Sequence, residues 1–124
     1  MDESRHNIPV RGRSLLALKI SLAAFFLYQG LDKFPERRLW VGIFDAIGFG
    51  QWFRYVTGIV EVAGAVMLVI PKLMTIGAGL LACAMAGALL VHLFVIGASP
   101  ATLFVALLLA LLVTIGWREF REGR

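Results

Sequence analysis

The stretch at 52–70, WFRYVTGIVEVAGAVMLVI, carries two charged side chains inside an otherwise apolar segment that ends at Pro71. Its 19 residues match the length that an α-helix needs to cross a hydrocarbon layer of about 30 Å. An ionised carboxylate at the depth of Glu61 is costly, so this side chain must be neutral, paired or turned toward protein. Because seven residues at about 100° each return to nearly the same helix face, Arg54 lies on that face as well. The spacing predicts that Arg54 pairs with Glu61 on the inward side of the helix.

The composition is that of an integral membrane protein. Of the 124 residues, 60% are hydrophobic and only 16% are charged, whereas soluble domains are about half apolar. The net charge of +4 comes mainly from basic residues between or beyond the apolar segments. In these positions basic residues orient a chain in a membrane, so we expect contact with membrane lipids and no binding of nucleic acid. The single cysteine, Cys83, can form no internal disulfide and is expected to be a small packing residue.

The apolar runs and the turns between them predict an all-α membrane protein, a bundle of four transmembrane helices. We expect these helices at 14–31, 52–70, 73–96 and 101–117, in a single domain over 1–124. The polar segments 1–13 and 118–124 are expected to be a flexible tail and a solvated tail, and Lys19 to extend its amine to the membrane surface. Glycine and alanine are frequent in the third helix, which should therefore lie at the centre of the bundle.

The connection at 32–51 contains a helical pattern of its own. Apolar side chains recur at the spacing of one helix face, while charged residues fall elsewhere; these apolar residues are Trp40, Ile43, Phe44 and Ile47. The pattern predicts a short amphipathic helix at the membrane interface, between the first two transmembrane helices, ending at Gly48-Phe49-Gly50. Such a helix can be an aromatic anchor, which we favour, or a lid over a cavity in the bundle.

Basic residues are distributed unequally between the two sides of the predicted bundle. Four spans put both termini on one side, which then has seven basic residues, whereas the other side has three. The first group is Arg5, Arg11, Arg13, Lys72, Arg118, Arg121 and Arg124, and the second is Lys33, Arg37 and Arg38. Basic loops stay in the cytoplasm, so we expect both termini to be cytoplasmic in the cell (inner) membrane.

With this orientation, the polar residues within the apolar segments gather in the outer half of the membrane. Inward-facing polar groups in a bundle indicate a binding pocket. The candidate ligand-binding residues are Gln29, Lys33, Trp40, Phe44, Arg54, Glu61 and His92. The alternative is a network of Arg54, Glu61 and His92 that only fixes the register of the helices. The sequence contains no metal-binding motif, and we expect no metal site.

Three stretches resemble the DoxX-like family of small four-helix membrane proteins. They are Gly30 followed by Lys33, RYVTGIVEVAGAVMLVIP at 54–71 and MAGALLVHL at 85–93. The resemblance assigns Lys33, Arg54, Glu61 and His92 to the family pattern. It also implies an association with membrane redox systems, because the wider family includes a quinone-reducing thiosulfate oxidoreductase and complexes that protect against thiol stress. The resemblance does not imply a particular reaction.

Three functions fit these observations. The first is an accessory subunit of a membrane redox system that binds a quinone or a lipid. Arg54 and His92 would bind its head group and Glu61 would accept a proton. The chain has no ligand set for haem or iron–sulfur clusters, so a redox partner protein would supply the electrons.

The second function is a proton-coupled or small-molecule transporter, which would act as a homo-oligomer. The third is an acid–base isomerase for a lipophilic substrate, with Glu61 and His92 as candidate catalytic residues. The inner half of the predicted bundle is short of polar residues, which argues against transport. We favour the first function, in which the chain is not an enzyme on its own.

Overall fold

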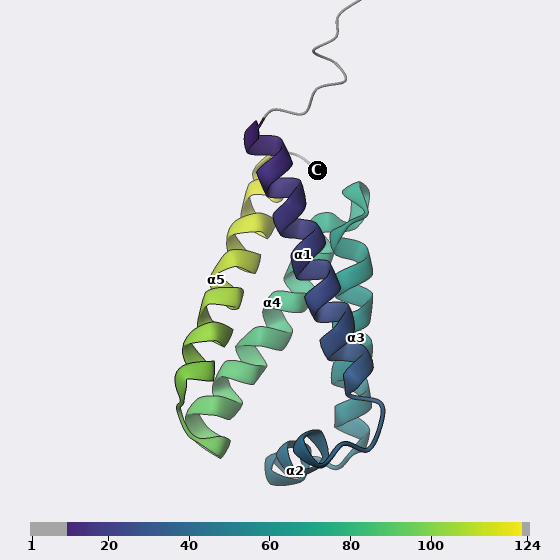
Figure 1. Cartoon of the computed structure of the whole chain (residues 1–124), viewed down its shortest axis with the longest axis vertical. Coiled ribbons are helices and arrows are strands. Elements are labelled where there is room, and N and C mark those ends of the chain that lie inside the picture. The colour runs from purple at the N-terminus through teal and green to yellow at the C-terminus, as the bar shows by residue number, and fades with distance from the viewer. Residues whose placement is uncertain (1–9, 123–124) are drawn as a thin grey trace, which may run out of the picture.

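The computed structural model describes residues 10–122, and this part of the chain is helical, without strands. The elements are α1 (Val10–Asp32), α2 (Arg38–Ile47), α3 (Trp52–Leu68), a 3₁₀ turn η2 (Pro71–Leu73), α4 (Met74–Val91), a π-helical turn η3 (His92–Ile96) and α5 (Pro100–Arg121). Four long helices follow the long axis of the molecule, and the short helix α2 lies across one end (Figure 1). The all-α prediction is confirmed. The predicted N-terminal tail lies outside the described residues up to position 9, and residues 10–13 are helical.

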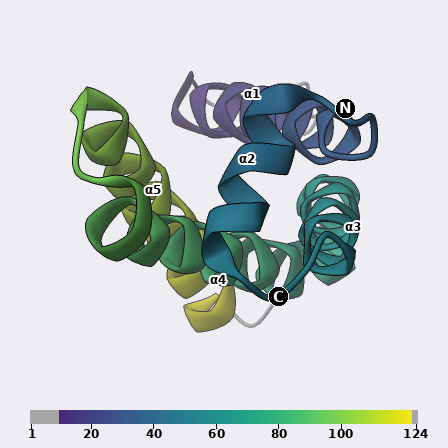
Figure 2. The ribbon, with the colours of Figure 1, turned by 90° about the horizontal axis from the view of Figure 1, so that it is seen from below.

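Helix α4 packs against both α3 and α5, and α1 packs against α3. Figure 2 shows the long helices end-on, with α2 crossing the space between them. Helices α1 and α5 lie close together at the end that holds the start of α1 and the end of α5, and they diverge toward α2 (Figure 1). Helices α3 and α4 each pack against two of the other long helices, so the glycine-rich third helix shares the predicted central position with α3.

Glycines allow the helices to touch backbone to backbone. A Cβ atom at Gly58 of α3 would lie 2.9 Å from the carbonyl oxygen of Gly30 in α1. At Gly77 of α4, it would lie 2.8 Å from the nitrogen of Leu68 and 2.9 Å from the oxygen of Gly64, both in α3. Small residues at such contacts let membrane helices gain van der Waals packing where apolar burial cannot drive association.

The apolar core fills the half of the bundle away from α2. Its most buried side chains belong to the second half of α3, the first half of α4 and the second half of α5, all of which lie at that end, together with Phe26 from α1. Leu68, Leu81 and Leu112 are completely buried there. The large apolar side chains therefore pack densely at the end of the molecule away from α2. The end that α2 covers contributes fewer residues to this core.

A buried ion pair joins α1 to α5 beside this core. The Nζ atom of Lys19 donates to Oε2 of Glu119 at 3.2 Å, and the two side chains are only 10% and 9% exposed. The prediction that Lys19 extends to the membrane surface was wrong. In the predicted solvated tail Glu119 is buried, whereas the other described residues from 118 to 122 are exposed. Helix α5 continues to Arg121, and Glu119 extends the buried stripe of Leu112 and Ile115 by one more turn. The partner for Lys19 is 100 positions away in the sequence, which explains why local spacing missed it.

Three helical segments of the described chain are long and apolar enough to cross a membrane: Arg13–Asp32, Pro71–Ile96 and Pro100–Arg121. Helix α3 has 17 residues, which correspond to about 25 Å at 1.5 Å per residue. It ends at Leu68, two residues before the predicted end. Proline disfavours a helical conformation in the residue before it, and Ile70 is extended (φ −98°, ψ 115°).

The glycine contacts lead to a first prediction. Gly77→Ala should destabilise the protein by about 1–3 kcal/mol, the usual cost of overpacking, because backbone atoms of α3 cannot move away from the added methyl group. Gly79→Ala is the matched control on the same helix, since nothing lies within 4 Å of a Cβ atom there. Thermal unfolding in mild detergent measures both variants. Equal melting temperatures would contradict close packing at Gly77.

Candidate functional site

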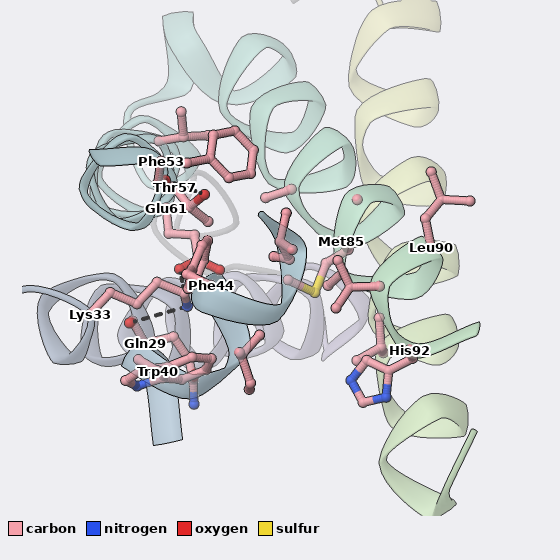
Figure 3. A pocket seen from close by; sticks show the side chains of 18 of the residues that line it. Gln29, Lys33, Trp40, Phe44, Phe53, Thr57, Glu61, Met85, Leu90 and His92 are labelled. Carbon is pink, nitrogen blue, oxygen red and sulfur yellow. Dashed lines mark hydrogen bonds and ion pairs between the residues drawn. The ribbon is translucent and has the colours of Figure 1, made fainter. Parts of the chain in front are cut away.

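A cavity of about 600 Å³ lies at the end of the bundle that α2 covers. All five α-helices and the turn η3 contribute to its wall. The wall is mainly aromatic and aliphatic, and its polar side chains are Gln29, Lys33, Thr57, Glu61 and His92 (Figure 3). Cavities of this size and character are typical of sites for small molecules and cofactors.

The cavity brings together most of the candidate residues identified in the sequence. Six of them line its wall: Gln29, Lys33, Trp40, Phe44, Glu61 and His92. The seventh, Arg54, does not. These residues come from four separate segments of the chain. The sequence predicted only that they lie in the same half of the membrane, and the fold brings six of them into one cavity.

Helix α2 forms the cover of the cavity. The four apolar residues predicted to share a helix face, Trp40, Ile43, Phe44 and Ile47, all line the cavity. This arrangement supports the lid and not the anchor that we favoured. The helix ends as predicted at Gly48, which adopts a left-handed conformation (φ 89°).

Two sets of polar contacts hold the cover in place. At its start, Nε1 of Trp40 donates to Oδ2 of Asp32 at 2.8 Å, and Arg37 forms an ion pair with the same carboxylate. At the next residue along α2, the side-chain amide of Gln51 donates to the carbonyl oxygen of Val41 at 3.0 Å. The cover is thereby joined both to the end of α1 and to the start of α3.

The charged centre of the site is a buried ion pair between Lys33 and Glu61. Nζ of Lys33 lies 2.6 Å from Oε1 of Glu61, and the side chains are 5% and 3% exposed. The same ammonium group is 3.5 Å from the carbonyl oxygen of Gln29 and 4.0 Å from the centre of the Trp40 ring. The predicted pairing of Glu61 with Arg54 was therefore wrong. The last turn of α1 packs beside α3 and places Lys33 nearer to the carboxylate.

Arg54 instead closes the end of α1. Its guanidinium donates to the carbonyl oxygens of Lys33, Phe34 (3.3 Å) and Pro35 (2.9 Å), and its Nε atom donates to the side chain of Gln51 at 2.8 Å. These carbonyl groups belong to the three residues that follow α1, and the five fixed N–H groups of an arginine suit it to bind several carbonyl groups at once. Arg54 is thus a buried structural residue that supports the backbone of Lys33.

His92 lies at the junction of α4 and η3, across the cavity from Gln29 and Lys33 (Figure 3). Its Nδ1 atom is 3.1 Å from Oγ1 of Thr102 near the start of α5. Single π-helical turns occur frequently at functional sites. Thr102 is not among the residues predicted from the sequence, although Ser99 and Thr102 have the spacing of an N-terminal capping box.

Several residues of the wall were missed by the sequence analysis. Phe53 and Thr57 precede Glu61 at intervals of four residues, so the helical period could have identified them. Met85 also lines the cavity. Cys83 lines it as an exposed residue, and the expectation that it would be packed was wrong.

The apolar helices and the covered cavity define a small helical membrane protein. The sequence profile of the DoxX-like family matches residues 17–115, and the chain belongs to this family. A curated relative from Bacillus subtilis (strain 168), named uncharacterized protein YdgD, is 36% identical over 83 residues. That match covers 64% of this chain and 73% of the relative. No solved structure matches the chain.

A second prediction concerns the buried ion pair. Lys33→Met or Glu61→Gln alone leaves a buried polar group without its partner and should cost about 3–5 kcal/mol of stability. The double change Lys33→Met with Glu61→Gln should cost less than the sum of the two single changes. A double-mutant cycle by thermal unfolding in detergent measures this coupling.

The matched control combines Glu61 with Lys19 in place of Lys33. Lys19 pairs with Glu119 and, among residues 10–122, shares no hydrogen-bond or ion-pair partner with Glu61, so the effects of Lys19→Met and Glu61→Gln should add. Additive losses for Lys33 and Glu61 would contradict the pairing described above.

Proposed function

We propose that the protein binds an amphipathic quinone or lipid in the cavity and acts as an accessory subunit of a membrane redox system. The observation that carries this proposal is a mainly apolar cavity of about 600 Å³ with polar groups at two sides and an aromatic cover. The apolar wall suits a ring or an acyl chain, and a few polar groups suit the orientation of a head group.

The polar side chains of the wall have separate roles in this proposal. His92 reaches the cavity from the side opposite Lys33 (Figure 3) and can bind a head-group oxygen. Glu61 places its carboxylate at the wall, where it can exchange a proton with a bound molecule. A redox partner protein would supply or accept the electrons, in keeping with the DoxX-like family membership.

The closed half of the bundle favours binding over transport. A transporter needs a path to both sides of the membrane, whereas large side chains and the Lys19–Glu119 pair occupy the half away from α2. Leu68, Leu81 and Leu112 are completely buried in that half.

The proposed location is the cell (inner) membrane, with α3 as a fourth spanning helix beside the three longer ones. Helix α3 packs against α1 and α4, both of which belong to candidate spans, and this packing supports its position in the same layer. The start of α1 and the end of α5 lie together at the end opposite α2 (Figure 1). The excess of basic residues at that end supports cytoplasmic termini, with α2 at the outer interface.

The ligand proposal is tested by thermal unfolding in mild detergent. A benzoquinone with a ten-carbon chain and a diacyl phosphatidylglycerol are added separately, and the bound probe should raise the melting temperature by mass action. His92→Ala should weaken binding of the effective probe by about five- to tenfold, the usual effect of one lost hydrogen bond.

Phe94→Ala is the matched control, because Phe94 belongs to the same π-helical turn but is 79% exposed and does not line the cavity. It should bind the probe like the unchanged protein. If neither probe shifts the melting temperature, and mass spectrometry of the purified protein finds no bound quinone or lipid, the proposed function is wrong.

The proposed topology is tested by cysteine labelling in intact cells, with Cys83→Ala as the background. Ala98→Cys, in the turn before α5, should react with an impermeant thiol reagent from outside. Lys72→Cys, in the turn before α4, should react only after the inner face is opened. The reverse pattern would place the termini outside, and labelling of both positions from outside would exclude α4 as a spanning helix.

A further inference from the structure

We infer that Thr102 holds the neutral ring of His92 in the tautomer with its hydrogen on Nε2, so that the cavity selects ligands whose head group ends in a carbonyl oxygen. The selection of the ligand rests on the proposed function. The tautomer rests only on the contacts of His92 and Thr102, and it can be measured without a ligand.

The hydroxyl group of Thr102 has two neighbours. Its oxygen accepts the backbone N–H of Ser99 at 2.9 Å, as part of the capping box at the start of α5. It also lies 3.1 Å from Nδ1 of His92. A hydroxyl group can donate one hydrogen bond and accept two. Ser99 takes one of the accepting positions. The hydroxyl can therefore either donate to Nδ1 of His92 or accept from it.

Only one direction gives the hydroxyl hydrogen a partner. Among the hydrogen bonds of residues 10–122, Nδ1 of His92 is the acceptor available to Thr102. If Nδ1 carried the hydrogen and donated instead, the half-buried hydroxyl of Thr102 would have no acceptor for its hydrogen among the side-chain contacts of residues 10–122, which is unfavourable. Thr102 therefore donates to Nδ1, and the hydrogen of the neutral imidazole is on Nε2.

The Nε2–H group is then a donor that the cavity offers to a ligand. The ammonium group of Lys33 is already directed at Glu61, at the carbonyl oxygen of Gln29 and at the Trp40 ring. The hydroxyl of Thr57 donates to the carbonyl oxygen of Phe53 at 2.9 Å. A ligand oxygen on the His92 side thus meets a donor. A carbonyl oxygen needs nothing more, whereas a hydroxyl oxygen also accepts this bond but brings a hydrogen of its own, and Nδ1 of His92 is already occupied by Thr102.

Two sources supply this chemistry in a membrane, the ring carbonyl of a quinone and the ester carbonyl of a lipid. A hydroquinone presents hydroxyl groups in place of the two ring carbonyls. It therefore serves as the matched comparison with nearly the same shape and the same apolar chain.

Nitrogen NMR of the histidine ring tests the tautomer. The chain has two histidines, so His6→Gln leaves His92 as the only signal. At a pH where the ring is neutral, we expect the hydrogen on Nε2 and an unprotonated Nδ1. Thr102→Val should give a mixture of both tautomers, and Thr102→Ser should restore the original one.

Thr114→Val is the matched control for the same substitution on the same helix. The hydroxyl of Thr114 is exposed and donates to the carbonyl oxygen of Ala110 at 2.8 Å, one turn earlier, so its loss should leave the His92 signals unchanged. A hydrogen on Nδ1 in the protein with Thr102 intact would overturn the inference, whatever the protein binds.

Ligand selection is measured with the ten-carbon benzoquinone, its hydroquinone and the diacyl phosphatidylglycerol. We expect one of the two carbonyl probes to bind, and the quinone to bind better than the hydroquinone if the quinone is the ligand. Thr102→Val should weaken the effective carbonyl probe by about five- to tenfold, and Thr102→Ser should recover most of this loss. Tight binding that Thr102→Val does not change would overturn the selection, whereas binding of neither carbonyl probe to the unchanged protein would overturn the proposed function.

Discussion

The buried ion pair between Lys33 and Glu61 is the interaction on which the cavity end of this protein depends. A charge in a low-dielectric environment is tolerated only with a partner and further hydrogen bonds, and here the surrounding structure supplies both. The contact of Gly30 with Gly58 brings α1 and α3 close enough for the two side chains to meet. Arg54 holds the backbone carbonyl of Lys33.

A second buried pair, Lys19 with Glu119, lies at the other end of the bundle, and the two pairs have different surroundings. Lys19 and Glu119 join α1 to α5 beside a dense apolar core, at the end where these helices lie close together (Figure 1). Lys33 and Glu61 lie in the wall of a cavity under an aromatic cover. A buried ion pair therefore lies beside a dense core at one end of the molecule and in the wall of the cavity at the other.

Much of the architecture was predictable because it depends on local patterns. Apolar runs, prolines and glycines placed the long helices to within a few residues, and the period of Trp40 and Phe44 located the helix that covers the cavity. Six of seven candidate site residues line one cavity, because polar groups in apolar helices must face protein and were therefore easy to recognise. The seventh, Arg54, shares a helix face with Glu61 but binds the end of another helix.

The sequence by itself determined that the chain is an apolar helical protein, that Arg54 and Glu61 turn inward, and which face of α2 is apolar. Only the tertiary structure decided the partners: Lys33 for Glu61, Glu119 for Lys19, backbone carbonyls for Arg54 and Thr102 for His92. The physical reason is that a charged or polar side chain needs a partner wherever it is buried, and its position within an apolar segment already indicates this need. The identity of that partner depends on how closely two helices approach, which glycines distant in the sequence control.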